Sequence, residues 1–316
     1  PAADGWIVLT LARPDDDELL PAWLGLGAVP SLEDRWHAVA AAVRDRDRAD
    51  LVVAGVELGL AVGAVDRSAA DVASDGVVVM SSGDGLPRSI DGALVVDLSS
   101  LWAGPLCGSI LAMAGADVVK VESAQRPDGA RRGPPGFFDL MNGAKRSVTV
   151  DLSSDGGRRA LADLIARADV VIEASRPRAL AQLGIDAEAV LAGRTTTWVS
   201  ITGHGRSGDA ALRIGFGDDA AASGGLVVWD EAGPCFCADA IADPITGLVA
   251  AVATLESLAR PGAELLDVAL SRVAATMAGP TVPIPEGVQL EAARPQTRVT
   301  NQRAPEPGTH NTQLLR

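Results

Sequence analysis

Short apolar runs alternate with stretches of helical apolar spacing through the middle of the chain. Runs this short are typical of strands in a parallel sheet that is buried on both faces. They lie at residues 94–98, 117–122, 147–152, 170–172 and 198–201. Helices are expected at about residues 105–114 and 157–168, and a long apolar helix at residues 248–258. The alternation predicts an α/β fold with a Rossmann-like parallel sheet, which would bind its ligands beyond the carboxyl ends of the strands.

The same pattern divides the chain into four regions. Residues 1–66 contain an apolar run and a helical segment, and predict a small α+β domain at the amino end. Residues 67–90 are rich in Asp, Ser and Gly, which predicts a linker. Residues 91–278 are expected to form the large domain with the parallel sheet. Residues 279–316 are rich in Pro, Arg, Thr and Gln and predict an extended C-terminal arm.

Composition narrows the classes of partner. Apolar residues make up 47% of the 316 residues, which is enough for a sizeable core. Asp and Glu number 41 against 27 Lys and Arg, a formal charge of −14. This excess repels phosphate backbones and anionic lipid, so neither nucleic acid nor a membrane is expected as a partner. An anionic small ligand stays possible, because net charge does not describe the lining of one cleft.

Neither a signal peptide nor a membrane-spanning stretch is recognisable in the sequence, which predicts a soluble protein. The amino terminus lacks the basic and then apolar run of a signal peptide, and the apolar stretch 51–65 is too short to span a bilayer. Three cysteines cannot form a disulfide framework in a chain of this length and fit a reducing compartment. We therefore expect a cytoplasmic location. Because the chain begins with Pro1, it is either processed or part of a longer protein.

Two motifs suggest cofactor sites only weakly. Gly203, Gly205 and Gly208 match the glycine spacing of a dinucleotide-binding loop, but the helix and acidic residue that such a site needs do not follow cleanly. Cys235 and Cys237 lack the second pair of ligands that a structural zinc site uses. The three histidines are far apart in the sequence. We expect neither a metal nor a redox cofactor.

Five charged residues lie where chemistry could occur. Asp243 precedes the long apolar helix, where a carboxylate is a natural helix cap; taken alone, the sequence favours that role over a nucleophile that attacks an acyl group. Lys145 and Arg146 stand just before an expected strand, and Arg176 and Arg178 just after another. Each pair is either solvated or a landing site for phosphate.

Several segments together resemble CoA-transferase family III, the group that includes carnitine-CoA transferases, formyl-CoA transferase and α-methylacyl-CoA racemase. The matching segments are 96–105, 114–122, 142–152, 168–173, 200–205 and 223–225. Their order and spacing extend over about residues 91–278. The resemblance implies that region 91–278 binds CoA and that acyl-CoA and a carboxylic acid are the substrates. It also implies a Rossmann-like large domain and an interlocked homodimer.

The resemblance changes the interpretation of Asp243. In this family an aspartate attacks the acyl-CoA thioester to give a mixed anhydride, through which CoA and the acceptor acid are exchanged. Asp243 occupies the matching position and becomes the expected nucleophile. The resemblance further implies that Leu101, Trp102 and Ala103 lie beside the thioester and pantetheine arm, with Val150 near the nucleotide.

The chain departs from the family at several positions. Ala174 and Ser175 replace an Asn and an aromatic residue, and Gln182 stands where an Arg often contacts a CoA phosphate. Residues 4–65 resemble the family's small domain, so either the domain order is rearranged or the chain is the downstream part of a longer tandem protein. Two alternatives to an acyl-CoA:carboxylate CoA-transferase therefore stay open. One is a 2-methylacyl-CoA racemase or isomerase, which is disfavoured because its histidine is absent near Phe216; the other is a non-catalytic CoA-binding subunit.

Overall fold

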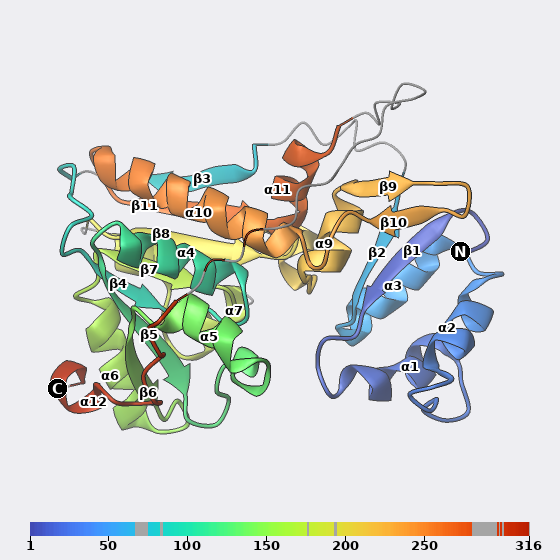
Figure 1. The fold of residues 1–316 in the computed structure, drawn as a ribbon, viewed down its shortest axis with the longest axis horizontal. Helices are drawn as coiled ribbons and strands as arrows, with labels where there is room; N and C mark the ends of the chain where they lie inside the picture. Colours follow the sequence, from blue (N-terminus) through green and yellow to red (C-terminus); the bar gives the residue numbers. More distant parts are fainter. Residues whose placement is uncertain are drawn as a thin grey trace.

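A seven-stranded sheet forms the centre of the molecule (Figure 1). The computed structural model describes residues 1–66, 75–82, 85–175, 177–192, 195–279, 296, 298 and 300–315. The strand order is β3-β11-β8-β7-β4-β5-β6. All neighbours are parallel except β3, which runs antiparallel to β11 at one edge. The strands are β3 (Val77–Ser82), β4 (Leu94–Asp97), β5 (Asp117–Ser123), β6 (Arg146–Val150), β7 (Val170–Glu173), β8 (Thr197–Thr202) and β11 (Glu264–Ala269). This arrangement confirms the predicted α/β fold class.

Helices cover both faces of this sheet. On one face pack α4 (Ala103–Met113), α10 (Ala242–Ala259) and α11 (Leu270–Met277). On the other face pack α6 (Asp155–Ile165), α7 (Pro177–Gln182), α8 (Ala187–Leu191) and α12 (Asn311–Leu314). Val95 belongs to the first of these cores and Val96 to the second. Because successive side chains of a strand point to opposite faces, the central strands are apolar throughout rather than alternating.

Helix α10 is long and apolar enough to cross a membrane by length and composition. Its inner face, however, packs against α4 and α11 in the core of the large domain. Three shorter elements complete this domain: α5 (Pro135–Asn142) and the 3₁₀ turns η1 (Gly129–Arg132) and η2 (Gly208–Leu212).

The amino-terminal residues form a second, smaller unit (Figure 1). It contains β1 (Trp6–Thr10), α1 (Asp16–Leu24), α2 (Arg35–Val43), α3 (Arg48–Leu58) and β2 (Ala61–Val65), with β1 antiparallel to β2. Two later elements pack on its two-stranded sheet: α9 (Gly217–Ser223) and the hairpin of β9 (Val227–Trp229) and β10 (Pro234–Phe236). Residues from the expected large domain thus complete the core of the small one.

The predicted linker 67–90 is wrong for residues 77–82, which form β3. Three consecutive valines favour a strand, and pairing with β11 outweighs the Ser and Gly residues around them. Residues 67–74 and 83–84 of the predicted linker lie outside the described residues.

The last described segment, 300–315, runs along the outer strand β6. The backbone N–H of His310 donates to the carbonyl of Ser147 (2.9 Å), and the Asn311 side chain bonds both backbone groups of Thr149 (2.9 Å each). Leu314 is buried in the sheet's second core. These contacts satisfy polar groups of a sheet edge that would otherwise be open to other chains.

Candidate active site

Asp243 lies where three helices begin. It is the second residue of α10, and its carboxylate accepts hydrogen bonds from the backbone N–H groups of Ala103 and Gly217. Ala103 is the first residue of α4 and Gly217 is the first residue of α9. The first N–H groups of a helix have no partner within the helix and carry partial positive charge, so they bind an anion. The arrangement is therefore built to hold a carboxylate.

The structure corrects the capping role that the sequence favoured for Asp243. The cap position of α10 is Ile241, and no side-chain cap is present there. The Asp243 carboxylate instead binds the ends of two other helices. Position 217 must be glycine for this contact, because a Cβ there would stand 2.4 Å from Asp243 Oδ2.

Backbone strain marks the same place. Among the described residues, only Leu101 and Ala240 combine a positive φ with a side chain, at 70° and 45°. Leu101 lies two residues before Ala103, and Ala240 three residues before Asp243. Strained residues of this kind gather at functional sites, where the surrounding structure over-determines the backbone.

The carboxyl group of Asp243 has an unusual pKa. Burial first, and then the negative charges of Asp219 and Asp218, raise the pKa to about 7, although the two N–H donors act to lower it. The Asp219 carboxyl is itself fully buried, and burial raises its pKa to about 7 as well. No Lys or Arg of the described chain lies within ion-pair distance of either group. Such shifts are characteristic of catalytic carboxyl groups.

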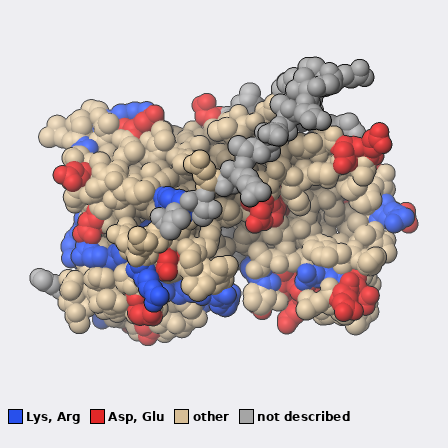
Figure 2. Space-filling model, viewed as in Figure 1, with Lys and Arg blue, Asp and Glu red and all other residues tan. Residues whose placement is uncertain are grey.

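A cleft of about 850 Å³ adjoins this site. It lies between the small unit and the carboxyl ends of β4 and β5. Leu101 and Phe216, neighbours of the two N–H donors, are part of its wall. Its basic side chains are Arg13, Arg126 and Arg132. Figure 2 shows basic side chains on the lower part of the larger lobe, next to the hollow between the lobes.

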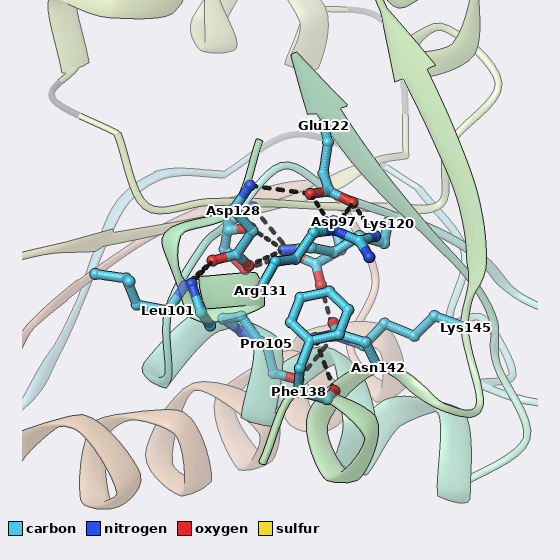
Figure 3. A network of polar contacts seen from close by, with 12 residues as sticks. Asp97, Leu101, Pro105, Lys120, Glu122, Asp128, Arg131, Phe138, Asn142 and Lys145 are labelled. Carbon is cyan, nitrogen blue, oxygen red and sulfur yellow. Dashed lines mark hydrogen bonds and ion pairs between the residues drawn. The ribbon is translucent and has the colours of Figure 1, made fainter. Parts of the chain in front are cut away.

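Buried ion pairs clamp the loop that leads to Ala103 (Figure 3). The Lys120 ammonium donates to the Ser99 carbonyl (2.5 Å) and to Asp128 Oδ2 (2.6 Å). Asp128 Oδ1 accepts from the backbone N–H of Leu101 at 3.0 Å. Glu122, which forms an ion pair with Arg131, accepts from the N–H of Asp128 at 2.9 Å. The loop is thereby held before α4 begins.

A second buried ion pair, between Lys145 and Asp97, holds the first turn of α4. The Lys145 ammonium donates to Asp97 Oδ2 (2.7 Å), to the Pro105 carbonyl (2.8 Å) and to Asn142 Oδ1 (3.0 Å). Burial by itself would raise the pKa of Asp97, but the charges of Lys145 and Lys120 outweigh it and hold that pKa below its usual value. Asp97 is therefore a stable anion.

Two of the residues expected to bind CoA have other roles. Lys145 is buried and its three donors are occupied, so it is neither a solvated residue nor available to a phosphate. Arg146 is the first residue of β6 and forms an ion pair with Asp117, the first residue of β5. It therefore lies at the amino ends of the strands, the edge opposite the one that binds ligands in such sheets.

The other residues that the sequence analysis expected at the CoA site also lie in different surroundings. Ala103 donates to Asp243, and the Trp102 ring packs edge-on against Phe137 at 5.2 Å between centroids. Val150 is buried at the carboxyl end of β6. Arg178 is exposed on α7, and Arg176 lies outside the described residues.

Sequence reasoning missed several residues of the site. The cleft's arginines and the fully buried Asp219 were not singled out. Arg126 and Arg132 stand in a loop rich in Pro and Gly after β5, which is the only sequence signal they offered. Ala174 and Ser175, two positions where the chain departs from the family, directly follow Glu173, which forms an ion pair with Arg206.

A second groove, of about 500 Å³, lies along β1. Apolar side chains of the small unit and the hairpin form most of its wall, including Val8, Trp36, Val227 and Phe236. Asp218 is at its margin and accepts a hydrogen bond from the backbone N–H of Ala240 (2.7 Å). The groove thus reaches the turn that precedes α10.

Within the described part of the chain, no three His, Cys, Asp or Glu side chains are grouped to hold a metal ion. Cys107 is buried, Cys235 and Cys237 are exposed, and all three are free thiols.

The fold and the site together define a Rossmann-like α/β protein with a carboxylate presented by helix ends beside a large cleft. The model of CoA-transferase family III matches residues 90–313, and the chain belongs to this family. In sequence it is 31% identical over 148 residues to a succinyl-CoA–D-citramalate CoA-transferase of Chloroflexus aurantiacus, covering 44% of this chain and 37% of that protein. It is 31% identical over 183 residues to a probable fatty acyl-CoA transferase of Mycobacterium tuberculosis, covering 54% and 46%.

Solved structures agree with this assignment. A CAIB/BAIF family protein from Brucella suis has a TM-score of 0.56 and 32% identity, and the likeness covers 60% of this chain and 55% of that one. A structure from Mycobacterium tuberculosis has a TM-score of 0.54 and 30% identity, covering 61% and 57%. The chain spans less than half the length of the two curated relatives above.

Proposed function

We propose that this chain carries the nucleophile and the CoA cleft of an acyl-CoA:carboxylate CoA-transferase, with Asp243 as the covalent nucleophile. The observation that carries the proposal is the geometry of Asp243. Its carboxylate is held by the first N–H groups of α4 and α9, beside a cleft of about 850 Å³ at the carboxyl ends of β4 and β5. A carboxylate fixed in this way can attack an acyl group without first being reorganised.

The reaction that the family resemblance implies uses only this carboxylate and the substrates. An Asp243 oxygen attacks the thioester carbonyl, the C–S bond breaks and CoA leaves as a thiolate, giving a mixed anhydride. The thiolate attacks the aspartyl carbonyl, which releases the donor acid and leaves an aspartyl-CoA thioester. The acceptor carboxylate attacks that thioester, its C–S bond breaks, and a second mixed anhydride and the CoA thiolate result. The thiolate then attacks the acceptor carbonyl of this anhydride, which forms the new acyl-CoA and releases Asp243 as a carboxylate. No net proton or electron is exchanged.

The cleft has the chemistry to hold CoA. Arg126 and Arg132 are exposed at its wall, and a guanidinium group suits a phosphate better than any other side chain. Leu101 offers an apolar surface next to the Ala103 N–H, where the pantetheine arm would lie. In this proposal the two arginines, rather than Lys145 and Arg146, bind the phosphates of CoA.

The groove along β1 suggests the class of acyl group. Its wall is largely apolar, and through Asp218 it reaches the turn before Asp243. We assign an apolar acyl chain to this groove. Val227→Trp would fill it and lower kcat/KM for longer acyl chains by about tenfold or more, while short acyl chains are unaffected. Val228→Trp is the matched control, because Val228 is the next residue and does not line the groove. Equal effects of both variants would contradict this assignment.

The decisive experiment is mass spectrometry of the Asp243 peptide after incubation with a panel of acyl-CoAs and hydroxylamine. Hydroxylamine converts an aspartyl anhydride or thioester into a hydroxamate of distinct mass. We expect a donor-dependent hydroxamate at Asp243. Asp243→Asn should lack it and lose at least about a thousandfold in transfer rate. Asp239→Asn, four residues upstream and exposed, should behave like the unchanged protein.

The alternatives give different results. A non-catalytic subunit would bind CoA and leave Asp243 unmodified across the panel. A racemase would exchange the α-proton of 2-methylacyl-CoA in deuterated water, and residues 216–219, the segment where that branch of the family has its histidine, contain none. The homodimer and the cytoplasmic location stay predictions, to be checked by light scattering and by cell fractionation.

A further inference from the structure

Two buried polar atoms without hydrogen-bond partners face each other beside α9. They are His204 Nε2 and Asp219 Oδ2, which are 3.9 Å apart. The His204 side chain is 4% exposed and that of Asp219 is 0% exposed. A buried polar atom without a partner destabilises a protein, so a pair of such atoms requires an explanation.

The hydrogen bonds around the pair determine where a proton must be. The other nitrogen of the His204 ring bonds the backbone carbonyl of Ile214, and a carbonyl only accepts, so that nitrogen carries the hydrogen. Burial and the charge of Arg213 lower the pKa of His204 to about 3, so the ring is neutral and Nε2 is an acceptor. Asp219 Oδ1 already accepts from the N–H of Phe216 at 2.8 Å.

An ionised Asp219 would therefore direct a second acceptor at His204 Nε2. A proton on Oδ2 removes this conflict, because the O–H group can donate to the ring nitrogen. The two atoms must approach by about 1 Å to form that hydrogen bond. The raised pKa of Asp219 agrees with a protonated carboxyl group.

We infer that Asp219 and His204 share one proton, and that this proton keeps Asp243 ionised as the nucleophile. The inference rests on the proposed function of Asp243. A neutral Asp219 removes a negative charge that opposes ionisation of Asp243. The other charged groups near the pair are Arg213, whose charge acts on both members, and Asp218, whose charge acts on Asp243.

Asp219 and His204 are thus positioning residues rather than groups that touch the substrate. Asp219 also caps α9 through the Phe216 N–H, which places the adjacent Gly217 N–H against Asp243. Thr10 of β1 donates to the Asp219 carboxyl group. The pair therefore connects the small unit to the position of the nucleophile.

The test is a pH titration of the ¹³C-labelled aspartate carboxyl groups by NMR on the full chain. Asp219→Asn and Asp243→Asn assign the two signals. We expect Asp243 to ionise first, while Asp219 stays protonated to higher pH. Asp219 ionising first would overturn the inference, and this readout does not depend on turnover.

Two variants sharpen the test. Asp219→Asn mimics the neutral acid and cannot ionise, so its kcat/KM profile should keep the acid limb set by Asp243 and lose any further change caused by ionisation of Asp219. His204→Phe removes the acceptor, so Asp219 ionises at lower pH. Its negative charge then opposes ionisation of Asp243, and the acid limb of the kcat/KM profile moves to higher pH. The expected loss is about tenfold at pH 6, with little change at pH 9. A His204→Phe variant that loses activity equally at every pH would contradict the inference, because a merely structural role predicts that result.

Asp218→Asn is the matched control. It removes a neighbouring negative charge, so Asp243 should ionise at lower pH while Asp219 still ionises second. The results also separate the inference from the proposed function. Transfer with Asp219 ionising first would refute only the inference. Absence of transfer with Asp243 ionising first would refute only the function.

Discussion

Two groups of buried carboxylates lie on either side of Ala103 and have opposite electrostatics. Around the loop before α4, Asp97, Asp128 and Glu122 each have a Lys or Arg partner within 2.7 Å. Around the start of α10, no Lys or Arg among the described residues forms an ion pair with Asp219 or Asp243. The pKa of Asp97 and of Glu122 is held below its usual value, whereas burial raises the pKa of Asp219 and of Asp243 to about 7.

The difference indicates that the two groups of carboxylates have different roles. Asp97 and Glu122, whose pKa values are lowered, stay charged over a wide pH range, and the paired carboxylates fix the backbone, which suits a scaffold. Carboxylates held by N–H and hydroxyl donors without a paired cation can gain or lose a proton near neutral pH, which suits a reactive site. The scaffold positions the Ala103 N–H, which binds Asp243, the nucleophile in the proposed function. Substitutions on each side should therefore have different kinds of effect.

The largest effect should come from breaking the scaffold. Lys145→Met leaves Asp97 buried without its cation, and the free energy of unfolding should fall by about 3–5 kcal/mol. Urea denaturation at pH 7 measures it. The double variant with Asp97→Asn should recover part of the loss, because the uncompensated charge is gone. The control is Arg146→Met, whose partly exposed pair with Asp117 should contribute less than about 1 kcal/mol.

A substitution in the group around Asp243 should raise the free energy of unfolding rather than lower it. The folded pKa of Asp219 is about 7 and the unfolded value is 3.8, so only the folded state keeps the proton between those pH values. Stability therefore falls as pH rises from 4 to 7. Asp219→Asn avoids this loss and should raise the free energy of unfolding by up to about 4 kcal/mol at pH 8, with almost no gain near pH 4. A variant that is less stable than the unchanged protein at pH 8 would remove the contrast between the two groups.

The contribution of Glu122 to stability should depend on pH with the opposite sign and a smaller magnitude. Burial alone would raise its pKa, but Arg131 and the Asp128 N–H outweigh it and lower the pKa below 4.5. Its contribution is thus present above pH 4.5 and lost as pH falls through the folded pKa. Glu122→Gln should lower the free energy of unfolding by about 2 kcal/mol at pH 7 and by much less at pH 3. An effect independent of pH would show that packing, not charge, is responsible.

The smallest effect concerns the hydrogen bond between Thr10 of β1 and Asp219 of α9. Thr10→Val removes a hydrogen bond that lowers the pKa of Asp219, so that pKa should rise, while stability falls by about 1 kcal/mol or less. NMR titration of the Asp219 carboxyl group measures the first effect. Thr276→Val removes a similar hydroxyl hydrogen bond on α11 and should leave the titration unchanged.

Local pattern predicted most strands of the large domain because each contains a short apolar run that is buried in the sheet. The runs at 94–98, 117–122 and 170–172 all became strands of the sheet. The strand at 77–82 was missed because its surroundings are rich in Ser and Gly, and only its pairing with β11 makes it part of the sheet. Propensity describes single segments and does not include such a partner.

The candidate site was predicted only in part, for a related reason. Asp243 was singled out through the family's motif order, and Ala103 through the same resemblance; the structure places the Ala103 N–H against the Asp243 carboxylate. Lys145 was misassigned because a basic residue before a strand looks the same in sequence whether its charge is solvated or buried. Its partner Asp97 lies 48 residues away in the chain, so only the fold brings the two together.

The sequence by itself determined the α/β class, the family and the identity of the carboxylate at the start of α10, because these depend on local periodicity and on motif order. The tertiary structure alone decided which charges are paired and which are not. Pairing depends on side chains distant in sequence meeting in a space without water, where a missing cation changes a pKa. The scaffold around Asp97 and the reactive group around Asp243 contain the same kind of residue, and only their surroundings distinguish them.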